Sequence, residues 1–121
     1  MKPIAIKLTV MQRIQLPGIL PEVGRLDIGR ACADIRTKLL PSQEEFKRSG
    51  FRQMDAGEGK TNILIPKNFS KLITFSPLEI EAIRIGFTTA EKQERLPIGP
   101  GWIELYDKVS RAWTSLDKDK K

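Results

Sequence analysis

The stretch Ser76-Pro77-Leu78-Glu79 decides the C-terminal half of the fold, because it marks a helix start more strongly than any other part of the chain. Serine suits the N-cap position, proline suits the first helical position, and a glutamate three residues after the serine completes a capping box. We predict a helix from Pro77 to about Arg95, with Gly86 inside it at a point of close packing. The helical spacing of apolar residues predicts its buried face: Ile80, Ile83, Phe87 and Ala90.

A second helix is predicted after the Pro97–Gly101 break, from Gly101 to Ser115. Large apolar side chains recur on it at helical spacing: Trp102, Tyr106, Val109, Trp113 and Leu116. Because the break between the two helices is short, we expect them to pack as an antiparallel pair. The expected contact residues are Ile83, Phe87, Trp102, Tyr106 and Val109. The charged residues 117–121 are expected to form a flexible tail.

The N-terminal part of the chain is predicted to start with a strand and a short helix. Apolar residues alternate from Ile4 to Leu8, which is typical of a half-buried strand. The pattern Thr9-Val-Met-Gln12 is a capping box, so a helix should begin at Val10. Pro17 brings no amide hydrogen to the helical ladder and is expected to end or kink this helix.

A longer amphipathic helix follows. Asp27 is expected as its N-cap, and Pro41 ends it near Leu40. Its apolar face is predicted from four residues at helical spacing: Ile28, Cys32, Ile35 and Leu39. On the outer side, residues four apart carry opposite charges and are expected to pair: Arg30 with Asp34, and Asp34 with Lys38.

The middle of the chain combines a short helix with strand-like segments. Ser42-Gln-Glu-Glu45 is another capping box and predicts the helix. Phe51–Met54 and Thr61–Ile65 flank the glycine-rich stretch Asp55–Gly59, which predicts a β-hairpin with a longer loop. Lys71–Phe75 is a third strand candidate. We expect the loop to be exposed and mobile, and to be the place where a partner is met if the hairpin makes the contact.

Together these elements predict a single α+β domain over residues 1–116, with four or five short helices and a small, mostly antiparallel sheet or hairpin. The chain has 121 residues, of which 40% are hydrophobic and 30% charged, as expected for one globular domain. No apolar stretch reaches the length of a membrane helix, and the N-terminus carries no cleavage-site pattern of a signal peptide. We therefore expect a cytoplasmic protein that does not bind a membrane.

The chain contains no histidine and one cysteine, Cys32, which restricts its chemistry. Histidine triads, cysteine–histidine pairs, histidine-ligated zinc, internal disulfides and CxxC redox pairs are all excluded. Cys32 lies on the apolar face of its helix and is expected to be buried and inert. No catalytic residues, metal ligands or cofactor site are predicted, so a binding role is favoured over an enzyme.

Gly57-Glu-Gly-Lys-Thr61 is similar to the end of a phosphate-binding P-loop. That motif needs a further glycine where this chain has Met54, and it needs a helix after its lysine. Here the following residues read as a strand. We therefore interpret the stretch as a hairpin turn and expect no nucleotide site.

The formal net charge of +6 favours acidic partners, although the basic residues are dispersed over the chain. Basic side chains alternate with Phe46, Phe51 and Phe69 in the middle third, which favours nucleic-acid binding if the rings stack on bases. The alternative is that the rings are core and the charges ordinary surface. The candidate residues are Lys47, Arg48, Arg52, Lys60, Lys67 and Lys71. Trp113 has two open interpretations, as a core residue or as an aromatic contact for a partner.

Several stretches resemble small uncharacterised proteins encoded by bacteriophages and prophages. The N-terminal match runs from Leu8-Thr-Val-Met-Gln-Arg13 through Ile19-Leu-Pro-Glu-Val-Gly24 to the helical Ile35–Leu39. The C-terminal match comprises Ile73-Thr-Phe-Ser-Pro-Leu-Glu79 and Ile103-Glu-Leu-Tyr-Asp-Lys-Val109. Together they cover about half of the chain. The resemblance implies a compact α+β fold and a phage origin, and it implies no activity.

From these observations we expect a non-enzymatic accessory protein of phage type that binds a host or phage protein. Interference with host defence and a minor role in the virion or its assembly are both open. Nucleic-acid binding through the central basic residues is the alternative. The sequence does not determine the oligomeric state.

Overall fold

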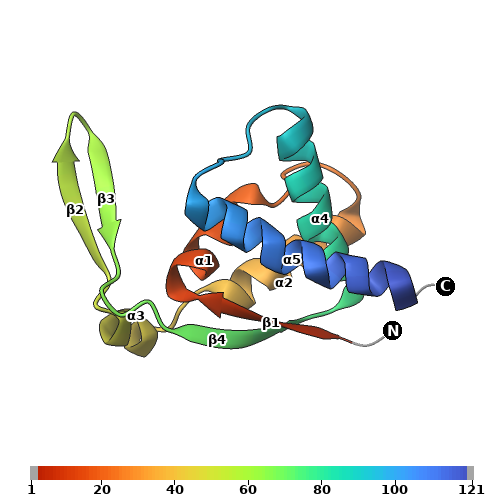
Figure 1. Cartoon of the computed structure of the whole chain (residues 1–121), viewed down its shortest axis with the longest axis horizontal. Coiled ribbons are helices and arrows are strands. Elements are labelled where there is room, and N and C mark those ends of the chain that lie inside the picture. The colour runs from red at the N-terminus through yellow and green to blue at the C-terminus, as the bar shows by residue number, and fades with distance from the viewer. Residues whose placement is uncertain (1–2, 120–121) are drawn as a thin grey trace.

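Two antiparallel strands, β1 (Ile4–Thr9) and β4 (Ser70–Phe75), form a small sheet from the two halves of the chain (Figure 1). The structure is a computed structural model and describes residues 3–119. Ile6 lies opposite Ile73 in the register, and alternation along the strands turns these side chains and that of Phe75 into the core. The predicted strand Lys71–Phe75 is confirmed, and its residues Ile73 and Phe75 share the buried face.

Helices α1 (Val10–Gln15), α3 (Gln43–Ser49) and α4 (Pro77–Lys92) start at the three predicted capping boxes. In each box the N-cap hydroxyl accepts a hydrogen bond from the backbone amide of the residue three positions later. The side chain of that later residue accepts a hydrogen bond from the backbone amide of the N-cap residue. Gly50 follows α3 with φ 73°, a left-handed conformation that glycine adopts without strain. Local side-chain chemistry thus sets all three starts.

Helix α2 (Leu26–Leu39) differs from the prediction at its start and on its outer side. Arg25, and not Asp27, is the N-cap, and it provides no side-chain hydrogen bond. Asp27 lies in the first turn, where its carboxylate accepts from the amide of Ile28. The expected charge pairs are wrong: Lys38 donates instead to Glu79 at 2.7 Å, because that buried carboxylate on α4 lies within its reach. This pair links α2 to α4.

Helix α4 buries the predicted face against α2 and against the 3₁₀ helix η1 (Leu16–Ile19), into which α1 continues without a break. Gly86 marks the contact with η1. A Cβ atom there would overlap the carbonyl oxygen of Ile19 and lie 3.1 Å from its carbonyl carbon. The predicted close packing at Gly86 is confirmed. The helix itself ends at Lys92, earlier than expected.

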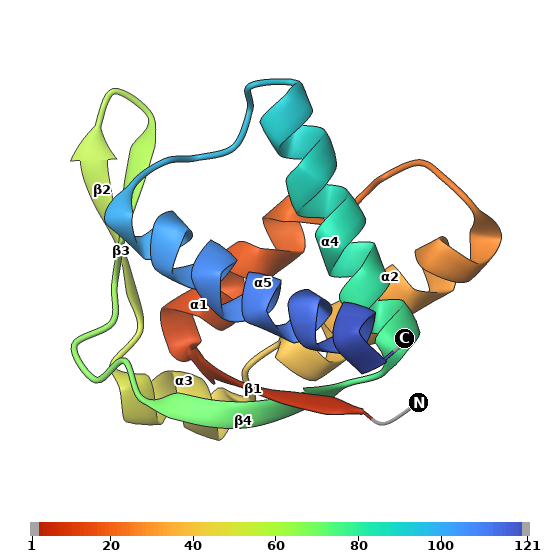
Figure 2. The same cartoon turned by 45° about the vertical axis from the view of Figure 1, so that its right-hand side comes forward.

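Helix α5 (Pro100–Asp119) crosses α4 steeply in both views, so the predicted antiparallel pairing is wrong (Figures 1 and 2). The helix covers β1 as well as α4, and this requirement sets its direction. Its buried positions are Leu105, Val109, Ala112 and Leu116. Trp102 and Tyr106, expected on the central contact, are partly buried at its margin, as is Trp113.

The C-terminal end of α5 extends into the segment expected as a tail. The helix continues through Asp119, and Asp117 pairs with Arg84 of α4 at 3.2 Å. Residues 120–121 of the expected tail lie outside the described residues. The charged end of the chain is therefore a helical extension at least as far as Asp119.

The hairpin of β2 (Arg52–Gly57) and β3 (Lys60–Leu64) projects from the rest of the molecule (Figure 1). The predicted hairpin is confirmed, but the prediction of a longer loop between its two strands is wrong. Gly57 pairs with Lys60, and the two residues between them, Glu58 and Gly59, both have positive φ. This is the turn that best suits strand twist, so the ladder extends into the glycine-rich stretch. A strand follows Lys60, as predicted for a hairpin turn.

Candidate binding surfaces

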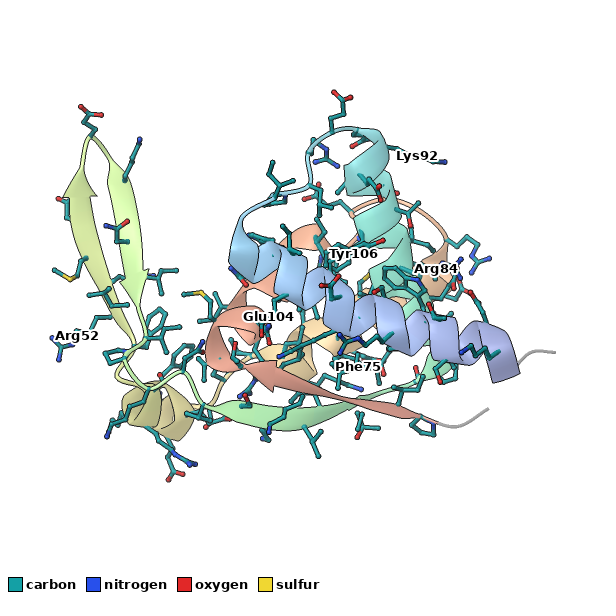
Figure 3. All side chains as sticks on the ribbon, viewed as in Figure 1. Arg52, Phe75, Arg84, Lys92, Glu104 and Tyr106 are labelled. Carbon is teal, nitrogen blue, oxygen red and sulfur yellow. The ribbon has the colours of Figure 1, made fainter. Side chains whose placement is uncertain are left out.

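Four of the six predicted basic residues gather at the base of the hairpin. Lys47 and Arg48 lie in the last turn of α3, and Arg52 opens β2 just after it. The amide of Lys67 donates to the carbonyl of Ser49 at 2.9 Å, which holds the β3–β4 link against α3. All four basic side chains are exposed, and Arg52 points away from the body (Figure 3). We call Lys47, Arg48, Arg52 and Lys67 the basic surface.

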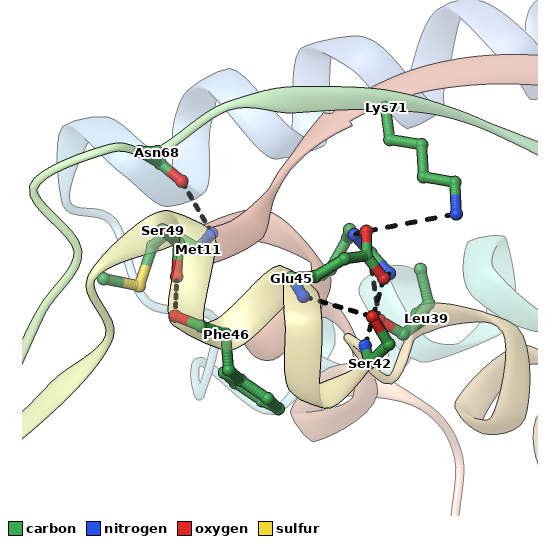
Figure 4. A network of polar contacts seen from close by, with 9 residues as sticks. Met11, Leu39, Ser42, Glu45, Phe46, Ser49, Asn68 and Lys71 are labelled. Carbon is green, nitrogen blue, oxygen red and sulfur yellow. Dashed lines mark hydrogen bonds and ion pairs between the residues drawn. The ribbon is translucent and has the colours of Figure 1, made fainter.

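The other two predicted residues lie elsewhere. Lys60 follows the hairpin turn at the far end from the base, beside Glu58. Lys71 on β4 has its ammonium group 3.9 Å from the carboxylate of Glu45 (Figure 4). The structure therefore brings four of the six predicted residues together and separates the remaining two.

The three phenylalanines between the basic residues pack locally. The rings of Phe46 and Phe51 meet edge to face with centroids 4.9 Å apart. The guanidinium of Arg48 lies over the ring of Phe69 at 4.5 Å, in cation–π geometry. All three rings are partly buried and lie outside the main core. They hold α3 to the hairpin base, and one face of Phe69 is already covered.

An ion pair joins α1 to α3, the helix that carries Lys47 and Arg48. Figure 4 shows its α3 partner, Glu45. Arg13 is only 2% exposed, and its Nε donates to the carbonyl of Leu39. Its two Nη atoms donate to the Glu45 carboxylate at 2.6 and 3.1 Å. The hydrogen bond from Arg13 lowers the pKa of Glu45 to about 2. Sequence reasoning missed this pair, because nothing in the spacing of the two residues relates them.

Cys32 is buried on the core side of α2, as predicted. Desolvation raises the pKa of its thiol, which opposes formation of the reactive thiolate. Within residues 3–119, no three or more cysteine, aspartate or glutamate side chains form a group that could hold a metal ion.

A second candidate surface, which the sequence did not suggest, is an apolar groove of about 470 Å³ between the end of α4 and the start of α5. Its lining residues, which define the α4–α5 groove, are Glu91, Glu94, Leu96, Pro97, Ile98, Trp102, Ile103 and Tyr106. Ile98 is 81% exposed and Ile103 52% exposed. Large apolar side chains so open to water, next to two aromatic rings, are typical of a contact site.

The end of α4 shapes this groove. Glu94 adopts a left-handed conformation with φ 54°, and the next amide, of Arg95, donates to the carbonyl of Ala90 at 2.8 Å. This pattern closes a helix and redirects the chain. The link then carries Ile98 outward before α5 begins. The apolar Ile98 within a proline- and glycine-rich link was the available signal for this site.

Trp113, the predicted aromatic contact, lies outside the α4–α5 groove. Its ring packs against Tyr106 at 5.5 Å and against Phe87 at 6.4 Å between centroids, and the side chain is partly buried. Trp113 therefore belongs to the margin of the core. Tyr106 and Trp102, about two and three turns earlier on α5, are the aromatic residues that line the groove.

Comparison with known proteins gives no relative. No family model matches the chain, no curated protein matches it, and no solved structure matches its fold. None of the helices between residues 3 and 119 is long and apolar enough to span a membrane.

Proposed function

We propose that this chain is a non-enzymatic accessory protein of bacteriophage type that binds a host or phage protein in the bacterial cytoplasm through the α4–α5 groove. The observation that carries the proposal is the exposure of Ile98 and Ile103 beside the partly buried rings of Trp102 and Tyr106. A partner that covered these side chains would remove a large apolar area from water, and aromatic residues commonly dominate the energy of such contacts. Interference with host defence and a role in virion assembly both fit a protein of this kind.

The charge at the rim of the groove specifies the partner further. Glu91 and Glu94 are the charged residues that line it, and both are exposed. Their carboxylates would face the flanks of any segment that fills the groove. The fitting partner therefore inserts an apolar side chain that has lysine or arginine nearby.

Ile103→Asp is expected to abolish capture of this partner in affinity purification from expressing or infected bacteria. The change puts a charge into the apolar centre of the contact, where it would have to lose its hydration. Leu40→Asp is the matched control. Leu40, like Ile103, is an exposed aliphatic residue, but it lies at the end of α2, outside the groove. The wild type and the control should retain a stoichiometric protein. Equal capture by all three chains, or no stoichiometric partner at all, would contradict the proposal.

Nucleic-acid binding by the basic surface is the second candidate. Its specific support is that none of Lys47, Arg48, Arg52 and Lys67 forms an ion pair within the described residues. Unpaired cations that gather at the base of a projecting hairpin provide a path for a phosphate backbone.

Four phosphate contacts predict a steep dependence of DNA affinity on salt. The logarithm of the binding constant should fall with the logarithm of salt concentration at a slope of about −3 to −4. Charge reversal by Arg48→Glu with Arg52→Glu should reduce the slope by about two, measured by fluorescence anisotropy with a labelled duplex. Arg30→Glu with Lys92→Glu, on α2 and at the end of α4, is the control with the same change in net charge. No binding at about 50 mM salt, or a slope that the reversal leaves unchanged, would exclude this function.

A further inference from the structure

Strand β1 has one free edge within the described part of the chain, because its sheet contains only β1 and β4. The amide of Val10 donates to the carbonyl of Phe69, which sets the phase of the ladder. Since backbone groups alternate in direction along an antiparallel strand, Ala5 and Lys7 direct their N–H and C=O groups away from β4. The carbonyl of Thr74, which lies opposite Ala5, agrees with this phase, because it accepts from a lysine of α2 on the far side of β4.

A shallow groove of about 390 Å³ runs along this free edge, between β1 and the C-terminal half of α5. Figures 1 and 2 both show that part of α5 beside β1. We call it the β1–α5 groove; its lining residues are Ile4, Ala5, Ile6, Lys7, Lys108, Arg111, Ala112 and Ser115. Ile6 and Ala112 are buried and supply apolar surface. The groove thus combines an apolar floor with unpaired main-chain groups.

The charge of the β1–α5 groove has one sign. Three of its lining residues are cationic, and none is acidic. Lys108 is partly committed, because its ammonium donates to Gln12 and lies 3.8 Å from Glu104. Lys7 and Arg111 form no ion pair within residues 3–119. The groove therefore offers a partner two cations without an ion pair among the described residues, Lys7 and Arg111. It also offers the outward N–H and C=O groups of Ala5 and Lys7.

We propose that the β1–α5 groove binds an extended acidic segment of a protein partner, which adds to β1 as a third strand. Its main chain would pair with the outward N–H and C=O groups of Ala5 and Lys7, in the manner of β-strand addition. Alternate side chains of an added strand face the same side, so acids at every second position on the side of α5 would meet Arg111, next to the partly committed Lys108. This site goes beyond the α4–α5 groove, whose rim is acidic and which favours a basic partner.

Amide hydrogen exchange followed by NMR tests the proposal with a defined probe. The probe is a capped peptide of about eight residues that alternates glutamate and threonine, a typical strand length. In the free protein the amides of Ala5 and Lys7 should exchange fast, while those of Ile6 and Leu8 are protected by the ladder. Saturating acidic peptide should slow exchange at Ala5 and Lys7 by about tenfold or more. A peptide with lysine in place of glutamate should have no effect.

Unchanged exchange at Ala5 and Lys7 with excess acidic peptide would overturn the proposal. The edge would then be left to solvent, and Lys7 would serve as the charged residue that keeps an edge strand from pairing. Equal protection by the acidic and the lysine peptides would also contradict it, because the predicted charge selection would be absent.

Two changes separate the main-chain from the charge contribution. Ala5→Pro removes an outward N–H and no ladder hydrogen bond, so the melting temperature should hold while peptide affinity falls about tenfold or more. Should this variant not fold, the same loss is expected for wild-type protein with a peptide N-methylated at alternate residues. Arg111→Glu should also weaken binding about tenfold, whereas Arg30→Glu on α2, with the same change in net charge, should not. Affinity that survives N-methylation and Arg111→Glu would refute strand addition.

Discussion

Gly86→Ala is expected to lower the free energy of unfolding by about 3 kcal/mol, although alanine is the better helix former. The added Cβ would overlap the carbonyl oxygen of Ile19 and lie 3.3 Å from the Cα of Leu20. These are backbone atoms, so no rotamer change can relieve the overlap, and α4 must move away from η1. Urea denaturation of the variant measures the effect.

Gly29→Ala provides the matched control. Gly29 lies in α2, and a Cβ atom there would meet nothing within 4 Å. The same substitution should therefore stabilise the protein by about 0.5–1 kcal/mol through helix propensity alone. If Gly86→Ala also stabilised the protein, this result would contradict the claim that the backbones of α4 and η1 leave no room for a Cβ atom at Gly86.

Glu45→Ala is expected to cost about 3 kcal/mol, because it leaves the buried guanidinium of Arg13 without its carboxylate. The capping box of α3 loses its second half at the same time. Replacing Arg13 by Met in the Glu45→Ala background should recover part of the loss, since the unpaired charge is then gone. A double variant no more stable than Glu45→Ala would show that the buried charge is not the cause.

The same ion pair predicts how stability depends on pH. The pKa of Glu45 is lowered from 4.5 to about 2 in the folded protein, so the folded state favours the ionised carboxylate. Its contribution is fully present above about pH 4.5 and is lost as the pH falls towards 2. The difference in unfolding free energy between wild type and Glu45→Ala should therefore be constant near neutral pH and shrink below 4.5. A difference that stays unchanged from pH 7 to about pH 2 would contradict the assignment.

The parts of the fold that the sequence predicts are those set by neighbouring residues. Thr9, Ser42 and Ser76 each cap a helix through a partner three residues on, so the pattern is visible in the sequence. The direction of α5 is not local. It depends on covering β1 and α4 together, and therefore the expected antiparallel pairing failed although the helix itself was predicted. The prediction of Asp27 as the N-cap of α2 failed because an aspartate, which suits the N-cap position, also suits the first turn of a helix.

The candidate surfaces divide in the same way. Lys47, Arg48 and Arg52 are close in sequence and stay together in the structure, whereas Lys71 is drawn to Glu45 by the pairing of β4 with β1. The α4–α5 groove escapes sequence reasoning because Trp102 and Tyr106, which line it, have the spacing of core positions of a helix. Ile103 lies outside the predicted apolar face of the helix and is 52% exposed.

Photocrosslinking in bacterial cells tests the central claim, that the α4–α5 groove binds a protein, most directly. A photoreactive benzoylphenylalanine is placed at Ile98, and separately at Leu40 as the control, since both side chains are exposed. We predict one discrete adduct with the probe at Ile98, none with the probe at Leu40, and loss of the adduct when Ile103→Asp is added. No adduct at Ile98, or the same adduct from both positions, would contradict the claim.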